Sequence, residues 1–154
     1  KNWEEIKAAE KGLPSAQLPE SGRSLLDGIP RRLPALHCAY QMTAKASRVG
    51  FDWNRLEDIL AKLQEEASEL VEAVRGSDPD RIADEIGDLL FVAVNAARFL
   101  GVDPETALRR SNDKFDRRFR YVESSVKRQG RSLKDASLAE MDALWDEAKT
   151  ARNL

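Results

Sequence analysis

Apolar residues recur at helical spacing through almost the whole chain after residue 29, and single glycines interrupt the pattern. In five successive segments these residues return every three or four positions, as on one face of an α-helix with about 3.6 residues per turn. The first four segments stop at Gly50, Gly76, Gly101 and Gly130, and glycine commonly ends a helix. No run of alternating apolar and polar residues competes. The chain is therefore predicted to be all-α, with a four-helix-bundle-like fold and an additional short C-terminal helix.

Local capping signals predict where the helices begin. Asp52 is expected to cap the second helix, and Asp78 with Pro79 supplies a cap and a first-position proline for the third. Ser137 and Glu140 have the spacing of a capping box that opens the last helix. The expected helices cover about residues 33–49, 52–75, 79–100 and 104–129, followed by a short one from residue 138.

The length of 154 residues, 42% of them hydrophobic, suits one domain. We interpret residues 1–28, whose second half is rich in Gly, Pro and Ser, as an N-terminal arm or linker, and residues 29–154 as the domain. Residues 3–7 (WEEIK) resemble residues 145–149 (WDEAK), and the first residue is not Met. We therefore expect the arm to be the tail of a preceding domain in a longer tandem protein; chance similarity of two short segments is the alternative.

Composition argues against several function classes. Charged residues make up 34% of the chain but leave a net charge of −2, so no specific nucleic-acid binding through a basic surface is expected. The single cysteine, Cys38, forms no intramolecular disulfide and favours a cytoplasmic location. His37 is the only histidine, which argues against Ser-His-Asp catalysis and histidine-rich metal sites. No apolar run reaches transmembrane length, so a soluble protein without membrane contact is expected.

One stretch of the third helix, residues 89–94 (LLFVAV), is apolar on every side. A helix with one solvated face should not have this character. We therefore expect a homodimer in which a second copy covers the additional face. The alternative is a central helix in a monomeric bundle.

Two pairs of carboxylates lie three residues apart on consecutive helices. Glu66 and Glu69 form one pair, Glu85 and Asp88 the other, and each pair shares a helix face at the border of the apolar stripe. An antiparallel hairpin would bring the pairs together, and four crowded carboxylates need a cation. Oxygen ligands select hard ions, so Mg²⁺ is expected and Mn²⁺ should substitute. Acidic faces that serve only solubility are the alternative for either pair alone.

The fourth helix is rich in arginine and lysine. Lys114 and Arg118 are neighbours one turn apart and could grip one polyphosphate together. A solvated basic face that pairs with acidic neighbours is the alternative interpretation.

These motifs together resemble the MazG-like all-α nucleoside triphosphate pyrophosphohydrolases. That family is marked by Glu-Glu-x-x-Glu followed on the next helix by Glu-x-x-Asp, which appear here at residues 65–69 (EEASE) and 85–88 (EIGD). The resemblance continues through DEIGDLLF, NDKFDRRF and the terminal Trp145 and Lys149, covers about residues 29–150, and is greatest to the C-terminal domain of tandem MazG proteins.

The resemblance implies a role for each of these positions. The implied Mg²⁺ ligands are Glu66, Glu69, Glu85 and Asp88. The implied nucleotide contacts are Lys62, Arg81, Asn112, Lys114, Arg118, Trp145 and Lys149. Glu65, beside the ligands, is our candidate to position or deprotonate the attacking water. Arg81 stands where lysine is expected in relatives, and Trp145 could instead anchor the last helix through its apolar surface.

The predicted reaction is Mg²⁺-dependent hydrolysis of a nucleoside triphosphate to monophosphate and pyrophosphate. A narrower enzyme that acts on deoxyuridine, deoxycytidine or modified triphosphates would use the same chemistry. From another class, a non-catalytic helical dimerisation half of a tandem protein is the main alternative, although the intact carboxylates argue against it. A helical nucleic-acid binder is disfavoured by the acidic balance.

Overall fold

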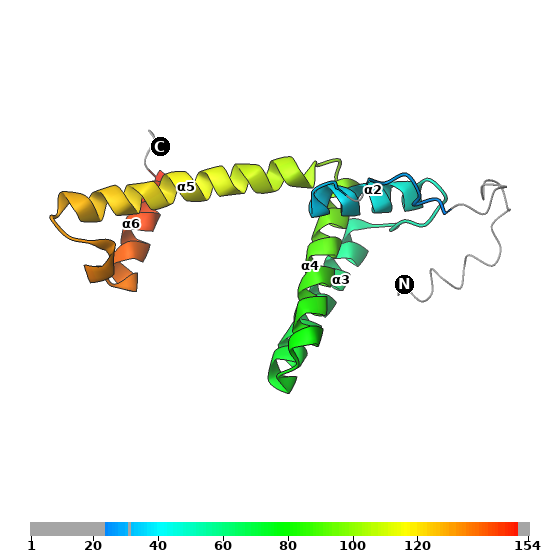
Figure 1. Ribbon diagram of the computed structural model, residues 1–154, viewed down its shortest axis with the longest axis horizontal. Helices are drawn as coiled ribbons and strands as arrows, with labels where there is room; N and C mark the ends of the chain where they lie inside the picture. The colour runs from blue at the N-terminus through cyan, green and yellow to red at the C-terminus, as the bar shows by residue number, and fades with distance from the viewer. Residues whose placement is uncertain (1–23, 31, 151–154) are drawn as a thin grey trace. The chain divides into compact units, whose positions relative to one another are not determined.

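The computed structural model describes residues 24–30 and 32–150 of the chain. Within these residues it contains α-helices and one short 3₁₀ helix but no strand, which confirms the all-α prediction. Most of the predicted N-terminal arm, including the repeat at residues 3–7, lies outside the described residues. The helices are α2 (Ala35–Ser47), α3 (Leu56–Gly76), α4 (Pro79–Phe99), α5 (Pro104–Arg128), η2 (Leu133–Asp135) and α6 (Leu138–Thr150) (Figure 1).

The chain divides into two compact units, and the boundary falls between Glu105 and Thr106 in the first turn of α5. In the first unit α3 and α4 form an antiparallel hairpin, with α2 packed against α4 (Figure 1). The apolar stripes of the helices meet here, and the fully or nearly fully buried side chains include those of Ile59, Ala73 and Val94. This packing fixes which faces of α3 and α4 confront each other.

A two-residue connection reverses the chain between α3 and α4. Gly76 is still helical, and Ser77 adopts the left-handed conformation with φ 52°, which ends α3 one residue later than predicted. Asp78 then caps α4 by accepting a hydrogen bond from the Arg81 backbone N–H at 3.2 Å, and Pro79 occupies the first position. The predicted start of the third helix is confirmed.

The predicted cap of the second helix is wrong. Helix α3 begins at Leu56, its N-cap is Arg55, and no side chain caps it. Asp52 instead forms an ion pair with Arg98 near the end of α4, and Arg98 NH1 donates to Asp52 Oδ2 at 3.1 Å. A hydrogen bond between two charged groups is stronger than one from a neutral backbone amide, so the carboxylate is drawn away from the helix start.

In the second unit, α5 and α6 contact each other through side chains. Tyr121 of α5 donates a hydrogen bond to Glu147 of α6 at 3.2 Å, and Val122, Val126 and Ala148 are buried. The predicted capping box is confirmed, because the Glu140 backbone N–H donates to Ser137 Oγ at 3.2 Å and the Ser137 N–H donates to the Glu140 carboxylate at 2.8 Å.

None of the helices in the described part of the chain combines the length and the apolar character that crossing a bilayer requires.

Candidate active site

Three carboxylates from the two arms of the α3–α4 hairpin converge on one point. Ligand oxygens of Glu66, Glu85 and Asp88 all lie within 4.8 Å of one another. The spacing of three residues in each helix places a pair on one face, and the antiparallel packing turns these faces toward each other. Glu66 and Glu85 are buried, with exposed fractions of 4% and 9%, whereas Asp88 is open to solvent.

Two cations partly neutralise this cluster. Lys62 Nζ lies 2.7 Å from Glu66 Oε1 and 2.8 Å from Glu65 Oε1, both on α3. Burial disfavours the charged form of Lys62, but its hydrogen bonds to the two glutamates outweigh burial and raise the pKa of the ammonium group above its ordinary value. On the opposite arm, Arg81 Nε lies 3.3 Å from Glu85 Oε1. Each buried glutamate thus has a basic neighbour one turn away on its own helix.

The remaining charge is still unfavourable. Partial burial, followed by the negative charges of Glu66 and Glu85, raises the pKa of both Glu69 and Asp88. Glu69 is therefore within electrostatic reach of the cluster, although its oxygens fall outside the set of three that meet most closely. The folded chain therefore disfavours the charged forms of these two carboxylates, first through burial and then through repulsion from Glu66 and Glu85.

Glu66 Oε2 shows how a cation would fit this site. This oxygen is buried and has no hydrogen-bond partner within the described part of the chain, whereas Oε1 is bound by Lys62. A buried, unpaired carboxylate oxygen costs free energy, and a metal ion would remove that cost. The donors are all carboxylate oxygens, which suit a hard divalent cation.

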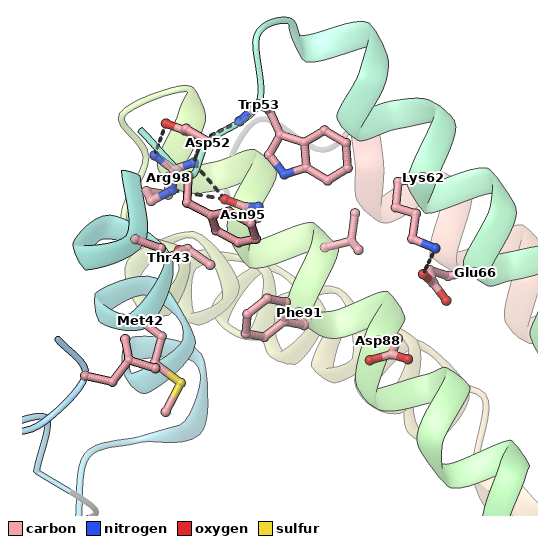
Figure 2. Close-up of a pocket in the computed structure, with 14 residues that line it drawn as sticks. Met42, Thr43, Asp52, Trp53, Lys62, Glu66, Asp88, Phe91, Asn95 and Arg98 are labelled. Atoms are coloured by element: carbon pink, nitrogen blue, oxygen red, sulfur yellow. Dashed lines mark hydrogen bonds and ion pairs between the residues drawn. The ribbon is translucent and has the colours of Figure 1, made fainter. Parts of the chain in front are cut away.

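A cavity of about 470 Å³ adjoins the carboxylates in the first unit. Figure 2 shows Lys62 and Glu66 on α3 and Asp88 on α4 at one part of its lining, with Phe91 and Asn95 further along α4. Most of the wall is apolar or aromatic, and a second polar group lies away from the carboxylates (Figure 2). The apolar lining includes Met42, Phe51, Trp53, Phe91 and Val92, and the second polar group consists of Thr43, Asp52, Asn95 and Arg98.

Sequence reasoning did not identify this second polar group. Asn95 had a recognisable signal, because it follows Asp88 by seven residues and Phe91 by four, a spacing that places all three on one face of α4. An amide within an otherwise apolar stretch of a buried face is itself unusual. Thr43 and Asp52 carried no comparable signal, since their position at the cavity depends on how α2 and the segment before α3 pack against α4.

The other predicted nucleotide contacts belong to the second unit. Trp145 is half-buried, its ring lies 5.2 Å from that of Phe115, and the Arg118 guanidinium sits 5.7 Å from its centroid. Lys149 pairs with Asp146 at 2.6 Å. The packing of Trp145 fits the alternative role of anchoring α6, and contact with a nucleotide stays a prediction. Asn112 and Lys114 are exposed on α5.

Comparisons with known proteins agree with these features. Residues 54–122 match the family model described as the MazG nucleotide pyrophosphohydrolase domain. The chain is 41% identical over 149 residues to the nucleoside triphosphate pyrophosphohydrolase/pyrophosphatase MazG of Thermotoga maritima, covering 97% of this chain and 54% of that protein. It is 39% identical over 149 residues to the nucleoside triphosphate pyrophosphohydrolase of Escherichia coli, covering 96% and 54%.

A shorter match reaches a protein with a different name. The phosphoribosyl-ATP pyrophosphatase of Methanosphaerula palustris is 40% identical over 72 residues, which is 45% of this chain and 68% of that protein. The chain spans about half the length of the Thermotoga and Escherichia relatives. The family match covers the hairpin with all four predicted carboxylates, and the identity to two MazG proteins extends over almost the whole chain. The chain therefore belongs to the MazG nucleotide pyrophosphohydrolase family.

Proposed function

We propose that this chain is a Mg²⁺-dependent nucleoside triphosphate pyrophosphohydrolase that converts a triphosphate and water to monophosphate and pyrophosphate. The observation that carries this proposal is that one cavity combines carboxylates with a largely apolar wall. Carboxylates of Glu66 and Asp88 line a cavity whose wall is otherwise largely apolar and aromatic. Its volume of about 470 Å³ lies within the range of small-molecule sites. A nucleotide has the matching halves, a polyphosphate that a metal ion would link to the carboxylates and a base whose flat faces are apolar.

The carboxylates Glu66, Glu69, Glu85 and Asp88 would hold the Mg²⁺, for which Mn²⁺ should substitute. When bound, the ion supplies charge for the polyphosphate oxygens and acidifies water. The approach of Glu66, Glu85 and Asp88 within 4.8 Å and the unpaired oxygen of Glu66 support this assignment. Glu69 is included among the proposed ligands because it interacts electrostatically with Glu66 and Glu85.

Side chains around the carboxylates have separate tasks in this proposal. Glu65, which is half-exposed and hydrogen-bonded to Lys62, accepts a proton from the attacking water. Lys62 holds Glu65 and Glu66 in place and balances their charge, and Arg81 does the same for Glu85. Five side chains of the second unit are proposed, from the family resemblance, to contribute contacts with the nucleotide, namely Asn112, Lys114, Arg118, Trp145 and Lys149.

A homodimer is part of the proposal. Apolar side chains on α3 and α4 remain 45–55% exposed, at Leu60, Val71, Val74, Ile86 and Leu90. On α3 they recur at helical spacing, and on α4 they lie one turn apart, so each helix carries an uncovered apolar stripe. Exposed stripes of this kind mark interaction surfaces, and a second copy supplies a matching apolar surface.

Two expectations stay predictions. Residues 29–154 are proposed as the catalytic domain of a tandem protein, and the location is proposed to be cytoplasmic because the single cysteine favours a reducing environment.

The test is incubation of the purified protein with the eight standard nucleoside triphosphates, with Mg²⁺ or with EDTA, followed by separation of all phosphate-containing products. Monophosphate and pyrophosphate in equal amounts, formed only with the metal, are expected, and the rates rank the bases. Release of diphosphate and phosphate would contradict the proposed reaction. Absence of turnover on every triphosphate, while Mg²⁺ still binds, would favour the non-catalytic dimerisation module.

A further inference from the structure

The cavity contains a hydrogen-bonded clamp, formed by Arg98 with Asp52 and Asn95, that has no role in holding the metal. The guanidinium of Arg98 binds two partners: it donates from Nε and NH2 to Asn95 Oδ1 at 3.0 and 2.8 Å, and from NH1 to Asp52 Oδ2 at 3.1 Å. Arg98 NH2 also donates to Asp52 Oδ1, which in turn accepts from the Trp53 backbone N–H at 2.8 Å. The Arg98 side chain is only 10% exposed. Figure 2 shows it beside Asp52 and Asn95.

This clamp decides the orientation of the Asn95 amide. A guanidinium has donors only, so the amide atom that faces Arg98 must be the oxygen. Two hydrogen bonds from a charged, planar group hold that oxygen, and rotation of the amide by 180° would set its NH2 group against the cation. Asn95 is 8% exposed and lines the cavity, so what it can offer to a bound molecule is its NH2 group, a donor.

Thr43, which also lines the cavity, has the opposite restriction. Its hydroxyl lies 3.0 Å from the Ala39 carbonyl and 3.1 Å from that of Tyr40, both within α2, so its single hydrogen is committed to the backbone. The residue is 8% exposed and lines the cavity, and its oxygen can therefore only accept. The cavity wall thus combines a fixed donor on α4 with a fixed acceptor on α2.

We infer that Asn95 is a specificity-determining residue that donates to an acceptor on the edge of the nucleobase, and that Arg98, anchored by Asp52, is the positioning residue that fixes this polarity. The inference rests on the proposed function, because it needs the triphosphate at the carboxylates to direct the base into the apolar part of the cavity. Nucleobases differ in the order of donors and acceptors on their edges, so a wall of fixed polarity discriminates between bases that carry a carbonyl and bases that carry an amino group.

The test is Asn95→Asp, which keeps the shape of the side chain and replaces the donor by an acceptor. For the triphosphate that the wild type prefers, kcat/KM should fall at least about tenfold, mainly through KM, because a buried donor is lost and two acceptors then face each other. For triphosphates whose base presents an amino group instead of a carbonyl, kcat/KM should change less. The ratio of kcat/KM between the two kinds of base therefore shifts. Gln129→Glu, on the surface of the second unit, is the control for the added negative charge.

Inorganic triphosphate, which has no base, separates this inference from the proposed function. Its inhibition constant should be the same for wild type and Asn95→Asp, because it occupies only the carboxylate end. Arg98→Lys should raise KM and shift the base ratio in the same direction, since one ammonium group cannot hold Asn95 and Asp52 together. A merely structural role for Arg98 would lower the melting temperature without altering the ratio.

Three outcomes decide the matter. A shifted base ratio with unchanged inhibition by inorganic triphosphate supports the inference. An active wild type whose base ratio is the same in Asn95→Asp would overturn the inference and leave the proposed function intact. A wild type that neither hydrolyses triphosphates nor is protected from thermal unfolding by them overturns both.

Discussion

Lys62 and Glu66 form an ion pair of 2.7 Å across one turn of α3, yet only one oxygen of the carboxylate takes part. The other oxygen, Oε2, is buried without a hydrogen-bond partner in the part of the chain that the structure describes. Glu66 also belongs to the cluster of carboxylates with Glu85 and Asp88. Lys62 therefore fixes one oxygen of Glu66 but leaves the other without a hydrogen bond. The unpaired buried oxygen of Glu66 is the physical basis of the first prediction.

Mg²⁺ should raise the melting temperature of the protein. A cation at 100 times its dissociation constant stabilises the folded state by about 2.7 kcal/mol, which for a chain of this size corresponds to about 5–10 °C. Glu66→Gln should reduce this increase, because it removes the buried charge from the ligand set. Thermal unfolding with Mg²⁺ and with EDTA measures both effects. An equal increase in the wild type and in Glu66→Gln would exclude Glu66 as a ligand.

Asp88→Asn should lower kcat by about 100-fold or more with little loss of stability. The substitution removes one of the three converging carboxylates. Replacing even a residue that only hydrogen-bonds to a metal ligand lowers metal affinity or activity by roughly 10- to 100-fold. In EDTA the melting temperature should not fall, because the raised pKa of Asp88 reflects first its partial burial and then repulsion from Glu66 and Glu85, which the amide relieves.

Asp80→Asn is the matched control for Asp88→Asn. Asp80 lies exposed in the first turn of α4 and is not among the converging carboxylates. It should retain turnover close to that of the wild type. If both variants lost activity to the same extent, general helix charge rather than the cluster would be responsible.

Leu90→Glu should convert the proposed dimer to a monomer. Leu90 is 54% exposed on α4, one turn after Ile86 in the apolar stripe, and a charge buried at an interface without a partner costs several kcal/mol. Sedimentation or light scattering at several protein concentrations gives the mass. Leu138→Glu makes the same exchange at an exposed leucine of α6 and should leave the mass unchanged. A wild-type chain that is monomeric throughout contradicts the dimer.

Acid should weaken the second unit through Glu140. Hydrogen bonds from Arg131, and then from Ser137, lower the pKa of Glu140 from its ordinary 4.5 to about 2 in the folded protein. The unfolded chain binds the proton more readily between these values, so this contribution to stability is present above about pH 4.5 and is lost as the pH falls toward 2. The pair is exposed, so solvent keeps the effect small.

Denaturant unfolding of wild type and Glu140→Gln from pH 7 to pH 3 measures this loss. The difference in the free energy of unfolding between the two should shrink as the pH falls. Asp142→Asn, which removes a carboxylate that forms no ion pair within the described residues, should show no such convergence.

The parts of the fold that local chemistry controls could be read from the sequence. The cap at Asp78, the proline after it and the capping box at Ser137 each act within one helical turn, and the structure confirms all three. The spacing of three residues likewise assigned Glu85 and Asp88 to one face. The same reasoning wrongly predicted Asp52 as a helix cap, because its partner, Arg98, is 46 residues away in the chain.

The sequence by itself determined an all-α chain of the MazG type, with two acidic pairs on consecutive helices. Only the tertiary structure decided which of those carboxylates meet, because that depends on how side-chain packing rotates α3 against α4, which the cap at Asp78 does not fix. The same holds for the orientation of Asn95, which Arg98 and Asp52 impose from different segments. Helix periodicity follows from neighbouring residues, whereas a site between helices follows from packing that joins distant ones.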